Sequence, residues 1–357
     1  MPDARWIELQ QAAGAVLAEE TAWSPQALHF GDARAEYQAA KDQCAVFELS
    51  GRVQIELTGE DRATFLHNFF TNDIKRLAPG KGCEAFVVDV KAHVLAHVFV
   101  FAGETSIWID TVPGAEEALL AHLDKYLITE DVELHGRSAE FAGLFVTGPT
   151  AAEKLTSLGL LSTELSPLGH CTASDTTSLR RVDWFGSPGY LISTPRTVAA
   201  DCWQRLVDGD IRPAGDKAFQ SLRLETAFPL YGIDISNENL AQEVDRTAEG
   251  ISYTKGCYLG QEPIARIDAL GHVNKELRGL HVDSPTPPAA GAKILADDDL
   301  DIGRVTSAAF SFADDHAIAL GYLKRSHLAA ETNVRIETPN GPVAARVFRR
   351  ADGDSHE

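Results

Sequence analysis

Lys255-Gly256-Cys257-Tyr258-Leu259-Gly260-Gln261-Glu262 gathers an amine, a thiol, a phenol, an amide and a carboxylate in one short stretch of this 357-residue chain. Gly256 and Gly260 interrupt any regular helix or strand here. Glycine lets the backbone turn sharply or lets a ligand approach it closely. The stretch is therefore predicted to form part of a functional site.

Cys257 is the candidate reactive group of this stretch. A nearby ammonium favours the thiolate, so Lys255 is predicted to lower the pKa of Cys257 or to meet an anion. The alternative stays open, because a single cysteine in an intracellular protein is often only a small buried apolar side chain.

The cysteines and the apolar runs indicate the compartment. The 5 cysteines are scattered and contain no C-x-x-C pair, which argues against a disulfide framework and against a self-contained metal or cluster site. No apolar run approaches the roughly 20 residues that span a bilayer, and no basic and then apolar leader begins the chain. We expect a cytoplasmic protein without a membrane partner and without a metal site.

The charge limits the partners. A formal net charge of −20 opposes non-specific binding of nucleic acid. The segment 246–278 is the best local basic patch, with Arg246, Lys255, Arg266, Lys275 and Arg278. Direct tRNA binding is left open.

Periodicity predicts an α+β protein of two or three domains. Residues 52–57 alternate as a half-buried strand does, residues 5–20 have the spacing of a helix, and several short strands follow residue 276. We predict two mainly antiparallel α+β modules, 1–132 and 133–275, then a small β-barrel, 276–352, and a tail, 353–357. His93 and His97 fall in a predicted strand, about 13 Å apart, which is too far to chelate one metal ion.

Glu225 is the second candidate site residue. It ends an amphipathic helix predicted over 216–225, where the helix dipole disfavours a carboxylate. A carboxylate in that position is expected to have a ligand or a charged partner. The alternative is an exposed surface glutamate.

The stretch 255–262 resembles the K-G-C-Y-x-G-Q-E motif of the YgfZ family, folate-binding relatives of the glycine-cleavage T-protein that are tied to iron–sulfur enzyme maintenance and tRNA modification. Segments that look like pieces of the wider superfamily flank it: 46–50, 69–74, 222–225, 229–234, 302–307 and 318–322. The resemblance covers most of the chain from about 45 to 350.

The resemblance implies two α+β modules and a barrel around a central channel that holds tetrahydrofolate. It assigns Glu225 to the pterin, since a carboxylate accepts N–H donors from the pterin edge. It adds Tyr231, Asn72, Asp73 and Arg266 as folate-binding residues. Around Cys257 and Lys255, the motif residues Gly256, Tyr258, Gly260, Gln261 and Glu262 support or order the loop.

One departure separates the chain from aminomethyltransferases, which carry an aspartate pair where this chain has Ala96 and His97. An imidazole does not replace an anionic carboxylate, because its charged form is a cation. The resemblance therefore favours a folate-binding protein that supports iron–sulfur enzymes such as tRNA methylthiotransferases. If the protein is an enzyme, the expected activity is a tetrahydrofolate-dependent one-carbon transfer.

Two alternatives remain: an aminomethyltransferase of the glycine-cleavage type, and a folate-independent scaffold. The role of Cys257 is also open between carrying a one-carbon unit, redox chemistry and contact with a transient cluster. A single cysteine does not hold a cluster alone, because clusters normally use about four thiolates.

Overall fold

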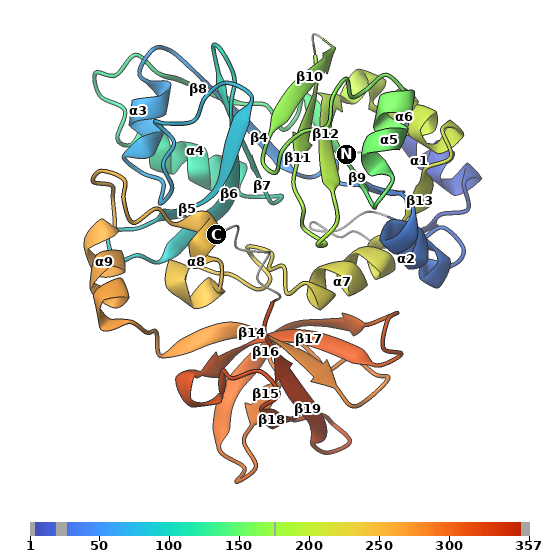
Figure 1. Cartoon of the computed structure of the whole chain (residues 1–357), viewed down its shortest axis with the longest axis vertical. Coiled ribbons are helices and arrows are strands. Elements are labelled where there is room, and N and C mark those ends of the chain that lie inside the picture. The colour runs from blue at the N-terminus through green and yellow to red at the C-terminus, as the bar shows by residue number, and fades with distance from the viewer. Residues whose placement is uncertain (1–3, 19–26, 175, 351–357) are drawn as a thin grey trace.

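The computed structural model describes residues 4–18, 27–174 and 176–350, so the predicted tail, 353–357, lies outside the described residues. Two α+β modules lie side by side, with a β-barrel against them (Figure 1). The predicted fold class is confirmed.

The first module is built on an antiparallel sheet in the order β5-β6-β7-β4-β8. Its strands are β4 (Val53–Thr58), β5 (Lys81–Val88), β6 (Val94–Ala102), β7 (Ile107–Thr111) and β8 (Glu133–Gly136). Helices α3 (Arg62–His67) and α4 (Glu116–Asp124) contribute Phe65 and Leu119 to the same apolar core as the sheet. The alternation seen in 52–57 thus corresponds to β4, which lies between β7 and β8 in this sheet.

The second module has a sheet in the order β10-β11-β12-β9-β3-β13, in which only the β13–β3 pair is parallel within the described residues. Its strands are β3 (Ala45–Glu48), β9 (Phe141–Thr147), β10 (His170–Ser174), β11 (Thr177–Arg181), β12 (Gly189–Pro195) and β13 (Arg212–Ala214). Helices α1 (Ala4–Ala12), α2 (Ala33–Asp42), α5 (Ala151–Ser157) and α6 (Arg196–Asp208) accompany the sheet. A short ribbon pairs β1 (Val16–Leu17) with β2 (Ala27–His29).

Two features differ from what the sequence suggests. The helix predicted over 5–20 ends at Ala12, because Gly14 takes a positive φ of 90° and β1 follows. Two strands also lie in the other module from the one that their position in the sequence predicts: β3 joins the second sheet and β8 joins the first. The division at residue 132 stays a prediction; among the described residues before β4, α1, α2 and β3 accompany the second sheet.

The barrel is closed in the order β14-β17-β16-β15-β18-β19. Its strands are β14 (Lys275–Val282), β15 (Lys293–Leu295), β16 (Asp301–Phe310), β17 (Ala317–Lys324), β18 (Asn333–Ile336) and β19 (Val343–Phe348), with a 3-10 turn η2 (Arg325–His327). The connection from the second module contains α7 (Asp216–Glu225), η1 (Ala241–Val244), α8 (Thr247–Gly250) and α9 (Gln261–Leu270). Helix α7 packs on β16 and β17, so the end that carries Glu225 is brought to the barrel (Figure 1).

The faces of the two modules meet through aromatic side chains. Phe99 of the first sheet contacts Trp184, which lies before β12, with ring centroids 5.8 Å apart. Phe228, just beyond α7, stacks on the ring of Trp184, with ring centroids 5.4 Å apart. These three side chains are nearly fully buried, so the space between the modules is packed at this level.

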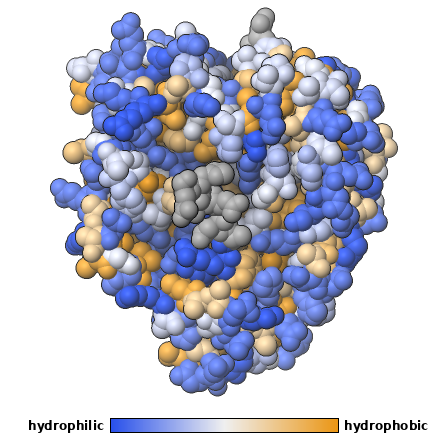
Figure 2. All heavy atoms as spheres, viewed as in Figure 1, coloured by the Kyte–Doolittle hydropathy of each residue, from blue (hydrophilic) through white to orange (hydrophobic). Residues whose placement is uncertain are grey.

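The outer surface shows no large apolar area in the view of Figure 2, where apolar residues form small separate patches among hydrophilic ones. Within the described ranges, no helix combines the length and the apolar character needed to cross a bilayer.

Candidate functional site

The buried side chain of Lys255 donates hydrogen bonds to three backbone carbonyls of the first module. Its Nζ donates to the backbone carbonyls of His67 and Phe70 at 2.5 Å and of Asn72 at 3.0 Å. The side chain is buried, and burial lowers the pKa of Lys255 to about 8. These contacts use the three N–H donors of an ammonium group. Any effect of Lys255 on Cys257 is therefore electrostatic, and the predicted activation of the thiol stays a prediction.

The rest of the stretch fixes the start of α9. Gly260, the residue before this helix, has a φ of +82°, and a Cβ there would stand 2.5 Å from the carbonyl oxygen of Asp89. Only glycine fits both conditions. Tyr258 is buried, with its ring centroid 4.6 Å from Nζ of Lys255. The motif thus holds α9 against the turn after β5.

Cys257 is exposed, in contrast to the buried position that the alternative interpretation required. It lines a pocket of about 580 Å³ together with residues of the same loop and of α9, among them Gln261, Glu262 and Arg266. The thiol therefore faces a ligand-sized hollow next to one cation and one carboxylate.

Glu225 is half-buried and accepts three hydrogen bonds from hydroxyl groups. Tyr37 Oη donates to Oε2 at 2.8 Å, and Ser221 Oγ and Ser311 Oγ donate to Oε1 at 2.9 and 3.1 Å. These partners are neutral hydroxyls, so the predicted ligand or charged partner of Glu225 stays a prediction, whereas the exposed surface glutamate is wrong because Glu225 is half-buried. A carboxylate has about four lone-pair positions, and among the described residues these three hydroxyls occupy three of them, with the fourth, on Oε2, not taken by a hydroxyl.

Sequence reasoning missed these three donors. Ser221 stands four residues before Glu225 on one face of α7, and that spacing is a usable signal. Tyr37 and Ser311 come from α2 and from the loop after β16, so no local pattern connects them to Glu225.

Glu84 lies in a buried cluster with His97 and Arg246. His97 Nε2 lies 2.7 Å from Oε1 of Glu84, and Arg246 donates to both carboxylate oxygens of Glu84. Burial alone would raise the pKa of Glu84, but Arg246 and His97 outweigh it and hold that pKa well below its ordinary value. The carboxylate of Glu84 is therefore ionised and fully engaged, and His97 sits in strand β6 as predicted.

The remaining predicted folate residues fall in separate places. Asn72 donates to the carbonyls of Glu84 and Glu249 at 2.8 Å, so it lies beside the ion cluster. The carboxylate of Asp73 lies 3.2 Å from Nδ1 of His67. Tyr231 is half-buried and packs against the apolar cluster that contains Phe86 and Ile235, and Arg266 is exposed in the Cys257 pocket. The structure thus places Asn72 and Asp73 near Lys255, and Arg266 near Cys257, while Glu225 stands apart at the barrel.

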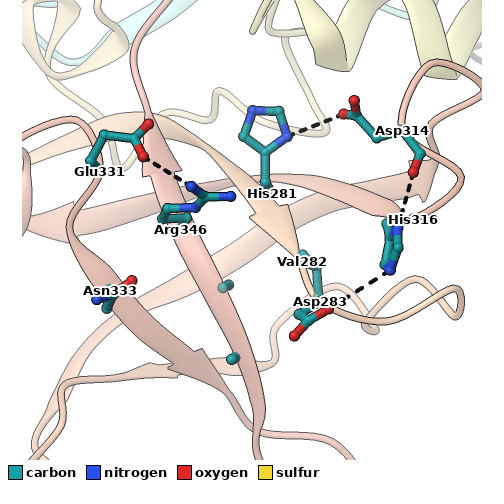
Figure 3. A pocket seen from close by; sticks show the side chains of 11 residues that line it. His281, Val282, Asp283, Asp314, His316, Glu331, Asn333 and Arg346 are labelled. Carbon is teal, nitrogen blue, oxygen red and sulfur yellow. Dashed lines mark hydrogen bonds and ion pairs between the residues drawn. The ribbon is translucent and has the colours of Figure 1, made fainter.

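A further pocket, of about 590 Å³, opens on the outer wall of the barrel (Figure 3). Its basic side chains already face carboxylates: His281 lies 3.3 Å from Asp314, His316 lies 3.7 Å from Asp283, and Arg346 lies 3.1 Å from Glu331. These pairs leave the pocket with no uncompensated cation to attract an anion.

Comparison with known families gives the chain its place. The GCVT N-terminal domain matches residues 6–246, and the glycine cleavage T-protein C-terminal barrel domain matches residues 275–351. The chain belongs to the GCVT family. This assignment covers both modules and the barrel.

Individual relatives agree with the family. An aminomethyltransferase of Saccharopolyspora erythraea is 26% identical over 365 residues, covering 96% of this chain and 97% of the relative. A putative chloroplastic transferase of Arabidopsis thaliana is 25% identical over 296 residues, covering 82% of this chain and 68% of the relative. The crystal structure of the glycine cleavage system aminomethyltransferase T from Bartonella henselae superposes with a TM-score of 0.88 at 22% identity, covering 96% of both chains, which shows the shared fold. The YgfZ branch within the family stays a prediction.

Proposed function

We propose that this protein binds a reduced folate such as tetrahydrofolate, with Glu225 as the acceptor for an N–H group of the pterin. The observation that carries the proposal is the Glu225 carboxylate, held by three hydroxyl donors with one acceptor position left. A fixed, charged acceptor of this kind makes strong hydrogen bonds to N–H donors.

Folate-dependent one-carbon transfer of the aminomethyltransferase type is the activity that the family favours. Two observations support it: the family match extends over both modules and the barrel, and a relative of that name aligns along almost the whole chain. In this proposal the folate accepts the one-carbon unit, and Glu225 holds the pterin while the transfer takes place.

A second candidate is the YgfZ-like role in maintaining iron–sulfur enzymes, including tRNA methylthiotransferases, in the cytoplasm. The specific observation in its favour is the ion cluster of Glu84, His97 and Arg246, which provides no uncommitted carboxylate where the aspartate pair would stand. Cys257 is exposed and lines a pocket, whereas the aminomethyl transfer proposed above assigns no role to a cysteine. This difference also favours the second candidate.

Two measurements test the proposals. Calorimetry under anaerobic conditions compares tetrahydrofolate binding by the wild type, Glu225→Gln and the surface control Glu153→Gln, at an exposed position of α5. We expect the dissociation constant to rise at least about tenfold in Glu225→Gln alone, since a lost hydrogen bond to a charged group costs roughly 1.5–3 kcal/mol. Equal binding by all three proteins contradicts the role of Glu225.

Two functional assays distinguish the two candidate activities. A glycine-cleavage assay reconstituted with the partner proteins should show turnover if aminomethyl transfer is the activity. Rescue of iron–sulfur-dependent tRNA methylthiolation in a strain that lacks its own relative, with loss of rescue in Cys257→Ala, would instead support the second candidate.

A further inference from the structure

The donors to Glu225 come from three different parts of the fold. Tyr37 belongs to α2 in the second module, Ser221 to α7 itself, and Ser311 to the loop that joins β16 and β17 of the barrel. Ser311 and Ser221 are fully buried and Tyr37 nearly so, so their hydroxyl groups compete with little water. Burial, together with the hydrogen bond to Glu225, raises the pKa of Tyr37, which keeps its hydroxyl protonated as a donor.

The barrel loop 311–316 is held rigidly against α2 and α7. Phe312 N donates to Ser221 Oγ at 3.0 Å, and Arg34 Nη1 donates to the Phe312 carbonyl at 2.9 Å. Arg34 also pairs with Asp315, and the rings of Phe312 and Tyr37 are 5.6 Å apart.

The loop is anchored to the barrel as well. Ser311 N donates to the His316 carbonyl at 2.8 Å, which closes the loop on itself. Asp314 and His316 reach His281 and Asp283 at the two ends of the wall seen in Figure 3, at 3.3 and 3.7 Å. The position of the Ser311 hydroxyl is therefore set by both the barrel and the second module.

We propose that Ser311 and Tyr37 are positioning residues that orient the Glu225 carboxylate so that a ligand meets a single acceptor position on Oε2. Two serine hydroxyls fill Oε1 and one tyrosine hydroxyl takes half of Oε2. The site then selects a heterocycle edge that presents one N–H donor there, and it rejects an edge that presents an acceptor, because two acceptors repel. This inference rests on the proposed folate binding and adds that the barrel takes part in it.

Two properties distinguish positioning from simple structural support. If Ser311 acts through Glu225, its removal has an effect only while the carboxylate is present. Threonine at 311 keeps the hydroxyl and should restore binding. Ser284 is a matched control, because it lies in a turn of the same barrel and bonds Thr286 rather than Glu225.

The experiment is calorimetry with tetrahydrofolate on Ser311→Ala, Ser311→Thr, Tyr37→Phe, Ser284→Ala, Glu225→Gln and the double variant Ser311→Ala/Glu225→Gln. We expect dissociation constants about tenfold higher for Ser311→Ala and Tyr37→Phe, and values within about twofold of wild type for Ser311→Thr and Ser284→Ala. The double variant should bind no more weakly than Glu225→Gln.

The outcomes that overturn the inference are distinct from those that overturn the proposed function. If Glu225→Gln weakens binding but Ser311→Ala and Tyr37→Phe bind as the wild type does, or if the Ser311 and Glu225 effects simply add, positioning is wrong and folate binding stands. If the wild type does not bind tetrahydrofolate at about 1 mM, both are wrong, since such an affinity is worth only about 4 kcal/mol.

Discussion

The role of Lys255 can be decided by one substitution, Lys255→Met, which removes the ammonium and keeps a side chain of similar length. Methionine leaves the buried carbonyls of His67, Phe70 and Asn72 without this donor. Each lost hydrogen bond to a charged group costs about 1.5–3 kcal/mol. The variant regains part of this loss, because it no longer removes an ion from water at a cost of several kcal/mol. We expect the free energy of unfolding to fall by a net of about 3 kcal/mol.

The assay is urea denaturation followed by tryptophan fluorescence, with Lys91→Met as the control. Lys91 is exposed in the turn after β5, and its substitution should change the free energy of unfolding by less than about 0.5 kcal/mol. A second readout is the rate at which iodoacetamide modifies Cys257 in the native protein, measured by mass spectrometry. Burial raises the pKa of Cys44 and Cys83 to about 12, which protects these thiols from the reagent.

The free energy of unfolding and the modification rate of Cys257 together distinguish a structural role of Lys255 from activation of the thiol. If the role of Lys255 is structural, Lys255→Met loses stability but its Cys257 is modified at a rate within about twofold of wild type, because the lysine donors point to carbonyls. An unchanged free energy of unfolding combined with a modification rate at least about tenfold slower would refute the structural reasoning, since that is the signature of a lost thiolate.

Further predictions concern the same core. Glu84→Gln leaves Arg246 buried without its counter-charge and should lower the free energy of unfolding by about 3–5 kcal/mol in urea titrations. Because the pKa of Glu84 is lowered in the folded protein, the stability it provides is complete above the unfolded pKa of about 4.3 and is lost as the pH falls below it. Thermal melts at pH 5 and pH 3 should therefore show a larger loss for the wild type than for Glu84→Gln; equal losses would contradict the assignment. Gly260→Ala meets both the positive φ and the Asp89 carbonyl and should cost at least about 2 kcal/mol, whereas Gly271→Ala, with a similar φ but open space, should cost about 1 kcal/mol.

Local patterns in the sequence predicted the parts of the fold that depend on neighbouring residues. Alternation located β4 because one face of that strand is buried against the module core, and the six barrel strands lie at the predicted short runs for the same reason. The helix over 5–20 was wrong because apolar spacing continues past Gly14, while the positive φ of that glycine turns the chain.

The site could be predicted only where its residues are close in sequence. The candidates in 255–262 and at the end of α7 follow from local sequence, but the contacts of Lys255 do not, because its side chain reaches carbonyls some 185 residues earlier in the chain while Cys257 is exposed. The hydroxyl group of Tyr37 meets Glu225 because α2 packs on α7, and that of Ser311 does so because the barrel packs on α7. No local periodicity records either contact.

The aspartate pair missing at Ala96 and His97 leads to a last prediction, since it bears on whether aminomethyl transfer could be introduced. His97→Asp would place a second carboxylate against Glu84, whose Oε1 now lies 2.7 Å from the imidazole. Two neighbouring buried carboxylates disfavour each other's ionisation, and Arg246 compensates only one. The single variant should lose about 3–5 kcal/mol of unfolding free energy in urea titrations, and the double variant Glu84→Gln/His97→Asp should recover at least half of that loss, because the cluster then holds one carboxylate and one guanidinium. Equal stability of the wild type and His97→Asp would show that the cluster accepts a second carboxylate at no cost, which contradicts this reasoning. If the recovery is found, the histidine and the Glu84–Arg246 pair form one unit, and gaining the aspartate requires dismantling that unit rather than exchanging one side chain.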